Sequence, residues 1–145
     1  MMTSDELEQH IRQGIPLSAE MGFRVLELSS NSIQVLGGEQ ENINVHGTAF
    51  AGALYSVCTL AAWGLVTSRL PQDASLVLAE GSIRYRKPVV GNIVADCEVS
   101  VREMDDFLNA LNRRGRARLV ATVSVPCNGE TAAEFTGTVY ASIKK

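Results

Sequence analysis

The sequence predicts an α+β fold in which a curved antiparallel sheet wraps around one long central helix. Two observations support this prediction. First, the run of residues 42–69 contains no Asp, Glu, Lys or Arg between His46 and Ser68, and a helix that is apolar on every side must be enclosed by other elements. Second, four later segments alternate apolar and polar residues, the pattern of strands with one buried face. A single sheet can enclose a helix only by curling around it.

Length and composition indicate one domain, residues 1–145. The apolar fraction of 46% and the charged fraction of 20% are ordinary for a soluble globular protein. A formal net charge of −3 argues against nucleic acid as a partner. The apolar run is rich in Ala, Gly, Ser and Thr, so we expect a buried helix and no membrane span. The first residues lack a basic-then-apolar leader, and we therefore expect a cytoplasmic protein.

The first quarter of the chain contains three predicted elements. Residues 4–13 are typical of a short amphipathic helix, which Ser4 can cap. Residues 15–23 are apolar but irregular, and we expect a connection that lies against the core. Residues 24–28 and 32–36 then predict two short strands joined as a hairpin.

The central helix is expected to begin at Thr48, whose hydroxyl can accept a hydrogen bond from a first-turn amide. The loop before it, residues 37–47, contains Asn42, Asn44 and His46. These polar side chains would lie where the free N–H groups of the helix point outward, a position that favours negative charge.

The second half of the chain is predicted to form four long strands, residues 75–86, 92–102, 116–125 and 131–143, with a short irregular or helical connection at 104–112. In the first of these strands the expected buried face consists of Val77, Ala79, Gly81, Ile83 and Tyr85. In the second strand the expected buried face runs from Ile93 to Val101. One helix, two strands, a long buried helix and four strands make the arrangement called the hotdog fold.

Two strings of residues resemble hotdog-fold acyl-CoA thioesterases. The first is N-x-N-x-H-G-T-A-F-A-G-A-L-Y at 42–55, and the second is S-I-R-Y-R-K-P-V-V-G-N at 82–92. The chain is most similar to the thioesterase family that also occurs as a domain C-terminal to GNAT acetyltransferases. The resemblance implies a homodimer or a dimer of dimers with active sites at the subunit interface. It also implies that the acyl chain lies beside the central helix.

The sequence departs from the better-known thioesterase branch in one respect. That branch has an acid in the central helix nine residues after its His, and the equivalent count from His46 reaches Tyr55. The helix therefore contains no carboxylate to act as general base or nucleophile.

Thioester hydrolysis needs a polarised carbonyl and an activated water. The backbone amides of Gly47 and Thr48 are the predicted oxyanion donors, and Asn42 and His46 are predicted to orient the water or the carbonyl. The alternative for Asn42 and Asn44 is that they stabilise the loop through Asx turns. The alternative for His46 is a structural hydrogen bond at the helix entry.

Further residues are expected to contact the substrate. Phe50 and Tyr55 would line the pocket, although core packing is an equally simple role for Tyr55. Glu80 is the first candidate for a missing carboxylate, with Ser82 on the same strand face, and its alternative role is an outward-facing charge. Basic residues near the ends of strand segments would bind the phosphates of coenzyme A, unless they form a solvated face: Arg84, Arg86, Lys87, Arg113, Arg114, Arg116 and Arg118.

The sequence thus predicts a thioesterase for acyl-CoA or acyl carrier protein, with no metal and no cofactor besides the coenzyme A of the substrate. Two alternatives remain open. One is an acyl-CoA-binding or regulatory module without turnover, and the other is a hydratase or dehydratase on the same fold.

Overall fold

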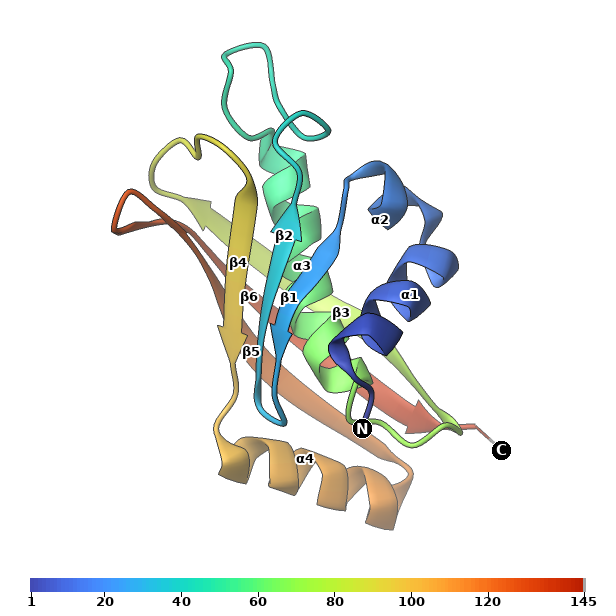
Figure 1. Ribbon diagram of the computed structural model, residues 1–145. Coiled ribbons are helices and arrows are strands. Elements are labelled where there is room, and N and C mark those ends of the chain that lie inside the picture. The colour runs from blue at the N-terminus through green and yellow to red at the C-terminus, as the bar shows by residue number, and fades with distance from the viewer. Residues whose placement is uncertain (145) are drawn as a thin grey trace.

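The computed structural model describes residues 1–144. Its elements are α1 (Ser4–Gly14), α2 (Pro16–Glu20), β1 (Arg24–Leu28), β2 (Ser32–Gly37), α3 (Ala51–Thr67), β3 (Ala74–Tyr85), β4 (Ile93–Glu98), α4 (Val101–Arg114), β5 (Arg116–Cys127) and β6 (Glu130–Ile143). The strands form one antiparallel sheet in the order β1-β2-β4-β5-β6-β3 (Figure 1).

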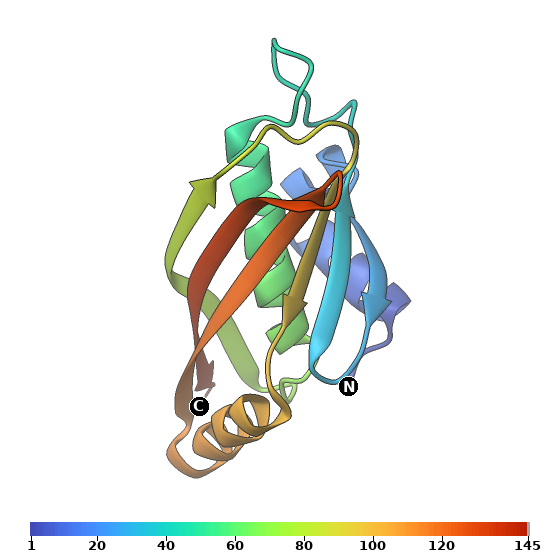
Figure 2. The ribbon, with the colours of Figure 1, turned by 90° about the vertical axis from the view of Figure 1, so that its left-hand side faces the viewer.

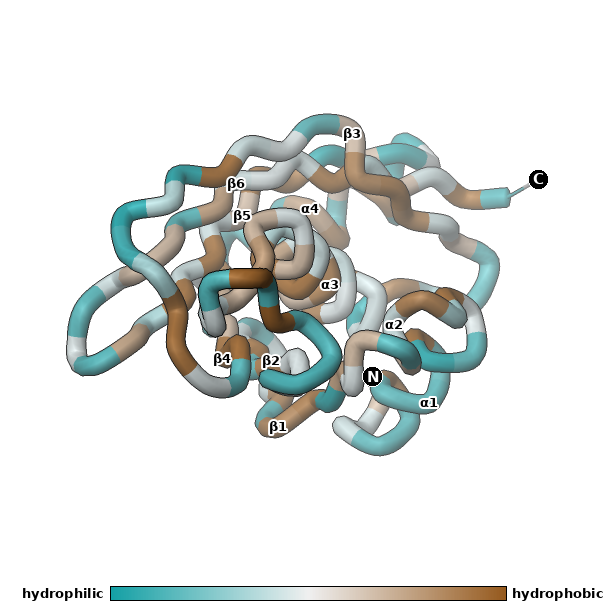
Figure 3. Tube along the Cα trace, turned by 90° about the horizontal axis from the view of Figure 1, so that it is seen from above, coloured by the Kyte–Doolittle hydropathy of each residue, from teal (hydrophilic) through white to brown (hydrophobic). Residues whose placement is uncertain are grey.

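The sheet curves around α3, and the predicted hotdog arrangement is confirmed (Figure 2). Viewed from above, α3 lies between the β3–β6–β5 side of the sheet and its β4–β2–β1 side (Figure 3). Its buried residues include Leu54, Val57, Leu65 and Val66, whereas Ala51 and Gly52 at its start are exposed. The central helix is therefore enclosed along its length and open at its first turn.

Two short helices cover the side of α3 that the sheet leaves free. In α1, Leu7 and Ile11 are fully buried, and a capping box between Thr3 and Glu6 fixes the helix start. Thr3 is therefore the cap, and the assignment to Ser4 is wrong by one residue. The segment expected to be irregular contains α2, because Pro16 suits the first turn of a helix.

A β-bulge in β3 corrects the predicted buried face of that strand. Pairing with β6 shifts between Leu78 and Glu80, so the alternation changes phase within the strand. Val77 is consequently 56% exposed on the outer face, whereas Leu76 is buried. The predicted face is wrong before the bulge and correct at Ile83 after it.

The strand predicted at 92–102 is shorter in the structure and is followed by a helix. β4 ends at Glu98, and the Ser100 hydroxyl accepts from the Glu103 amide to cap α4. Val101 therefore begins a helix and is 61% exposed, contrary to its predicted burial. The connection expected at 104–112 is this 14-residue helix, which ends at Gly115 with φ 76°.

No helix formed by residues 1–144 combines the length and the apolar character that crossing a membrane requires.

Candidate functional site

The loop between β2 and α3 is fixed at its base by Asn42. This side chain is 6% exposed, and its Nδ2 donates to the Met21 carbonyl at 2.9 Å and to the Gly38 carbonyl at 2.7 Å. The backbone carbonyl of Asn42 accepts from the Phe50 amide at 2.8 Å. Asn42 therefore ties the end of α2 to the start of α3, and it does so by donating to backbone carbonyls and not through the Asx turn expected as its alternative role.

The tip of this loop is organised by Asn44. Its Oδ1 accepts from the amides of His46 at 2.8 Å and Thr48 at 3.2 Å, and its backbone carbonyl accepts from the Gly47 amide at 3.1 Å. The two amides predicted to form an oxyanion site are thus already engaged, and that assignment is wrong. His46 is exposed, and its imidazole has no hydrogen-bond partner among residues 1–144.

The amides of Ala49 and Phe50 are also engaged, by the carbonyls of Val89 and Asn42, and the first open amides are those of the two residues that follow. Phe50, rather than Thr48, is the N-cap of α3, and its side chain makes no capping hydrogen bond. Within the described chain, the N–H groups of Ala51 and Gly52 have no acceptor, and both residues are exposed. A Cβ at Gly52 would lie 2.7 Å from the Phe50 ring, so glycine is needed where this ring crosses the helix start.

A groove leads from these amides along α3. Its mouth, of about 310 Å³, is lined by residues of α2, the loop and the first turn of α3: Leu17, Glu20, Met21, Glu41, Asn42, Phe50, Gly52, Ala53 and Ser56. Its inner part, of about 300 Å³, lies between α2, α3 and β3 and is mostly apolar: Ile15, Leu17, Ser18, Met21, Tyr55, Ser56, Thr59, Leu60 and Leu78. The two parts share Leu17, Met21 and Ser56 in their linings and therefore adjoin each other.

Two carboxylates at the groove mouth were not singled out from the sequence. Glu41 and Glu20 are both exposed and both line the mouth together with Gly52. The Glu41 carboxylate lies against Gly22 and Gly38, where a Cβ on Gly22 would be 2.9 Å from its Oε2. The sequence could have indicated Glu41 through its position directly before Asn42 in the loop of residues 37–47.

The predicted pocket residues Phe50 and Tyr55 do line the groove, at its mouth and its inner part respectively. Tyr55 meets Phe135 edge-on, with ring centroids 5.2 Å apart. The Tyr85 hydroxyl donates to the Ala51 carbonyl at 2.8 Å, which places the end of β3 beside the start of α3.

Glu80 and Ser82 lie elsewhere. They pair with Thr138 and Thr136 on β6, the residues on either side of the buried Gly137. Glu80 and Ser82 are therefore exposed on the face of the sheet away from α3. Within this chain neither residue lines the groove, so their predicted contact with substrate is not supported.

The basic residues form two groups instead of one. Arg84 is paired in register with Glu134 on β6, whereas Arg116 and Arg118 are paired through β5 with Ser142 and Tyr140. Along β6, Glu134 lies six residues from Tyr140 and eight residues from Ser142, which corresponds to about 20–26 Å. Only the group Arg84, Arg86 and Lys87 lies at the end of the sheet near the start of α3, so the two groups do not form a single phosphate site within one chain.

The buried thiols do not supply a nucleophile. Burial raises the pKa of both Cys58 and Cys97 to about 12, and the charge of a Cys97 thiolate contributes to the rise at Cys58. A thiol needs a lowered pKa to be reactive near neutral pH. Both are free thiols that act as small core residues.

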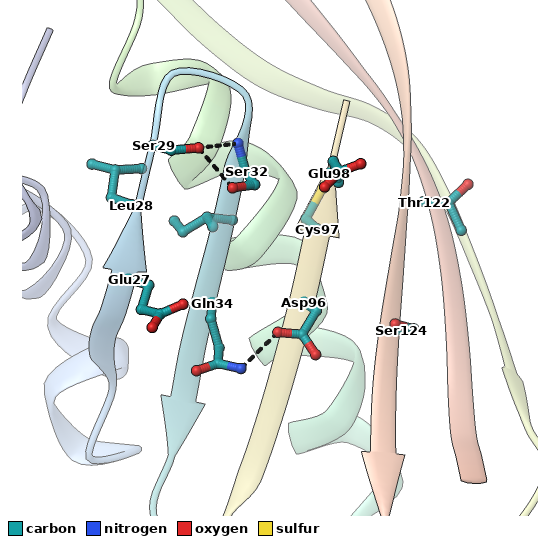
Figure 4. A pocket seen from close by; sticks show the side chains of 11 residues that line it. Glu27, Leu28, Ser29, Ser32, Gln34, Asp96, Cys97, Glu98, Thr122 and Ser124 are labelled. Atoms are coloured by element: carbon teal, nitrogen blue, oxygen red, sulfur yellow. Dashed lines mark hydrogen bonds between the residues drawn. The ribbon is translucent and has the colours of Figure 1, made fainter. Parts of the chain in front are cut away.

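A second cavity, of about 710 Å³, lies on the outer face of the sheet where β4 and β5 diverge (Figure 4). These strands pair only through Asp96 with Ser124 and Cys97 with Val123. Within its polar lining, Gln34 Nε2 donates to Asp96 at 2.8 Å, and the hydroxyls of Ser29 and Ser32 lie 2.7 Å apart. Glu27, Asp96 and Glu98 give it negative charge, which would repel the phosphates of coenzyme A.

The fold and the groove at the start of α3 define the class of hotdog-fold proteins. Comparison with known families gives the particular member of this class. The model of the family described as "Putative thioesterase (yiiD_Cterm)" matches residues 4–143, and the chain belongs to this family.

Solved structures agree with this assignment. A putative thioesterase from Shewanella oneidensis is 30% identical, with a TM-score of 0.83 over 97% of this chain and 96% of that chain. A protein of unknown function from Chlorobaculum tepidum is 26% identical, with a TM-score of 0.90 over 98% and 94%. The phenylacetic acid degradation protein PaaI from Thermus thermophilus is also 26% identical, with a TM-score of 0.64 over 86% and 97%.

Proposed function

We propose that the protein hydrolyses acyl thioesters of coenzyme A or of acyl carrier protein. The observation that carries this proposal is the pair of unpartnered amides at the start of α3, Ala51 and Gly52, of which Gly52 lines the mouth of the groove. In this arrangement the acyl chain enters the groove and the thioester carbonyl oxygen accepts from these amides. Negative charge that develops on the oxygen is further stabilised by the positive end of α3.

The amide donors are tested by the substitution Ala51→Pro. Proline removes the N–H but suits the first helical position, and Phe50, with φ −64° and ψ 134°, already has the backbone conformation required before proline. Loss of one oxyanion donor costs about 100- to 1,000-fold in kcat. The matched control is Val101→Pro, at the first position of α4 behind Ser100 with φ −61° and ψ 150°.

A free-thiol assay on a panel of acyl-CoA esters measures both variants. We expect Ala51→Pro to lose hydrolysis and Val101→Pro to retain it at the wild-type rate. Equal rates for the two variants would remove the Ala51 amide from the proposed site.

For activation of the water we propose Glu41, since α3 contains no carboxylate and Glu41 lines the groove mouth. The substitution Glu41→Gln keeps the shape of the side chain and removes its basicity, so kcat should fall by about 100-fold or more. The control Glu98→Gln changes a carboxylate on the outer face of the sheet and should leave the rate unchanged. If Glu20→Gln lowers kcat and Glu41→Gln does not, the base is Glu20.

We also propose that the chain acts as a homodimer or a dimer of dimers. Among the described residues β3 has a strand neighbour on one edge only, β6. The opposite edge of the sheet, β1, is partly covered, because Glu8 of α1 accepts from the Val25 amide at 2.8 Å. A long open edge strand favours pairing with a second copy. Light scattering coupled to size-exclusion chromatography tests this, and a monomer at micromolar concentration would contradict it.

The phosphates of coenzyme A are proposed to contact Arg84, Arg86 and Lys87. Arg86 lies 3.5 Å from Glu134, and Lys87 pairs with Glu130, whereas Arg84 has no ion-pair partner among residues 1–144. The substitution Arg84→Ala should therefore raise KM for acyl-CoA and leave kcat unchanged. The distant Arg118→Ala is the control.

A non-catalytic acyl-CoA-binding module is the second candidate, and the charge-free α3 favours it. Calorimetric binding with quantitative recovery of intact ester would support this function over hydrolysis. The hydratase alternative required a His and an acid near the same substrate carbons. In this chain His46 lies at the exposed loop tip and Glu80 on the outer face of the sheet, so this pair of residues gives that alternative no support.

A further inference from the structure

Trp63 lies on α3 about one helical turn beyond the residues that line the inner groove. Thr59 and Leu60, about one helical turn before Trp63, line the groove. Thr67, one turn after it, lines a separate cavity of about 540 Å³ together with Trp63 itself. Tyr55, Thr59, Trp63 and Thr67 are spaced by four residues and therefore share one face of α3.

The same boundary is present on β3. Leu78 lines the groove, whereas Leu76 and Ala74 line the far cavity. The indole Nε1 of Trp63 donates to the Leu76 carbonyl at 2.8 Å, which joins helix and strand between the two cavities. The His10 ring is stacked with the indole, with a centroid distance of 6.3 Å and an interplanar angle of 6°. Trp63 is thus held from the strand and from α1, and it separates the groove from the cavity beyond.

We propose that Trp63 limits the length of the acyl chain and that the groove takes linear acyl groups of about eight to ten carbons; this inference rests on the proposed function of the same groove. The seven residues from Gly52 to Thr59 advance about 10 Å along the helix axis. An extended chain advances about 1.2 Å per bond, since three bonds of extended peptide span about 3.3–3.6 Å. The groove therefore accommodates about eight or nine bonds beyond the carbonyl carbon.

The lining of the inner groove agrees with an unsubstituted hydrocarbon. Ile15, Leu60 and Leu78 contribute apolar side chains, and the Thr59 hydroxyl is buried without a partner in the described chain. No charged residue lines this part of the groove. The carboxylates Glu20 and Glu41 line the mouth and not the inner part, so a charged group on the chain has no charged partner farther in.

Trp63 is the only tryptophan in the chain, so its fluorescence reports directly on the end of the groove. The probes are non-hydrolysable thioether analogues of acyl-CoA with saturated chains of increasing length. Burying one methylene improves affinity by about fourfold. We expect the affinity to rise by this factor per carbon and then to level off at about ten carbons. Trp63 emission should shift only for analogues that approach this length.

A variant extends the test to specificity. Trp63→Leu opens the groove toward the far cavity, so affinity should keep rising beyond ten carbons and the preferred ester in hydrolysis should become longer. The control Thr67→Val alters the far cavity alone and should retain the wild-type profile. If Trp63→Leu does not fold, the wild-type emission series still decides the proposal.

The outcomes separate this inference from the proposed hydrolysis. Emission that responds equally to acetyl and decanoyl analogues, or to none, overturns the role of Trp63, and so does an affinity that keeps rising to palmitoyl in the wild type. These results leave hydrolysis untouched. A length-dependent emission shift without hydrolysis of any ester supports the groove assignment and overturns the thioesterase proposal.

Discussion

Replacing Gly81 by alanine tests how the groove wall is built. Gly81 on β3 faces Gly137 on β6, and the Phe135 ring lies over both. A Cβ at Gly81 would overlap the Tyr55 hydroxyl and lie 3.2 and 3.3 Å from two Phe135 ring carbons. Phe135 is fully buried and cannot move freely. Tyr55, which is only partly buried, must therefore give way toward the groove.

The expected cost is that of overpacking a core by one methyl group, about 1–3 kcal/mol. For a chain of this size that corresponds to a fall in Tm of about 3–10 °C. Thermal and urea unfolding measure it. Because Tyr55 lines the inner groove, the same substitution should also weaken the binding of medium-chain acyl-CoA analogues.

The substitution Tyr55→Phe removes the overlapping hydroxyl, which has no hydrogen-bond partner among residues 1–144. In a double-mutant cycle we expect Tyr55→Phe to restore most of the stability lost in Gly81→Ala. Gly14→Ala is the control, because a Cβ there meets no atom within 4 Å. A Gly81→Ala variant as stable as wild type, or additive effects in the cycle, would refute this account of the groove wall.

Three other predictions concern the supports of the fold. Asn42→Ala leaves the Met21 and Gly38 carbonyls without their donor and should cost about 2–4 kcal/mol in urea unfolding; an unchanged midpoint would contradict the anchoring role. Folding raises the pKa of Cys58 and Cys97 from 9.0 to about 12, so the stability that the neutral thiols confer is complete below pH 9 and is lost as pH rises toward 12. Unfolding under reducing conditions from pH 8 to 11 should show this loss, and a Cys58→Ala, Cys97→Ala variant should show less of it. Thr3→Ala removes the cap of α1 and should cost about 1 kcal/mol, with Ser4→Ala, at the neighbouring position inside the helix, as control.

The fold could be predicted because two of its patterns are nearly free of exceptions. The absence of charge from His46 to Ser68 required enclosure, and α3 is enclosed by the sheet and by α1 and α2. Strict alternation in β5 and β6 placed Leu119, Val123, Phe135 and Val139 on the buried face. Both signals come from many residues at once, so no single local feature could mislead them.

The errors arose where one residue changes the pattern. The bulge after Leu78 reverses the faces of β3, and a bulge inserts a residue without an obvious change in composition. At 99–102 the alternation continues through Val101 although Ser100 caps a helix. The Ser100 side chain binds the Glu103 amide, which would otherwise be free for strand pairing. The alternation of apolar and polar residues carries no information about such a cap.

For the site, the sequence located the loop but assigned its groups to the wrong task. Polar residues before the helix suggested that Gly47 and Thr48 would face a ligand, yet Asn44 uses both amides within the loop. Short polar side chains satisfy nearby backbone groups first. The free donors are therefore the amides of Ala51 and Gly52, farther along the chain. The N-cap before them is Phe50, whose side chain cannot accept a hydrogen bond from them.

The enclosure of α3 also explains why this site has its form. A helix without Asp, Glu, His, Lys or Arg offers no carboxylate or imidazole as general base, and burial raises the pKa of its one thiol, Cys58, to about 12. Its remaining chemical resource is the set of unpaired amides in its first turn. Proton transfer must then come from residues that meet that turn from outside the helix, and within this chain Glu41 and Glu20 line the same mouth. The division between backbone amides on α3 and a carboxylate on the loop or on α2 follows from the packing that encloses α3. The pair Ala51→Pro and Glu41→Gln tests the two halves of that division separately.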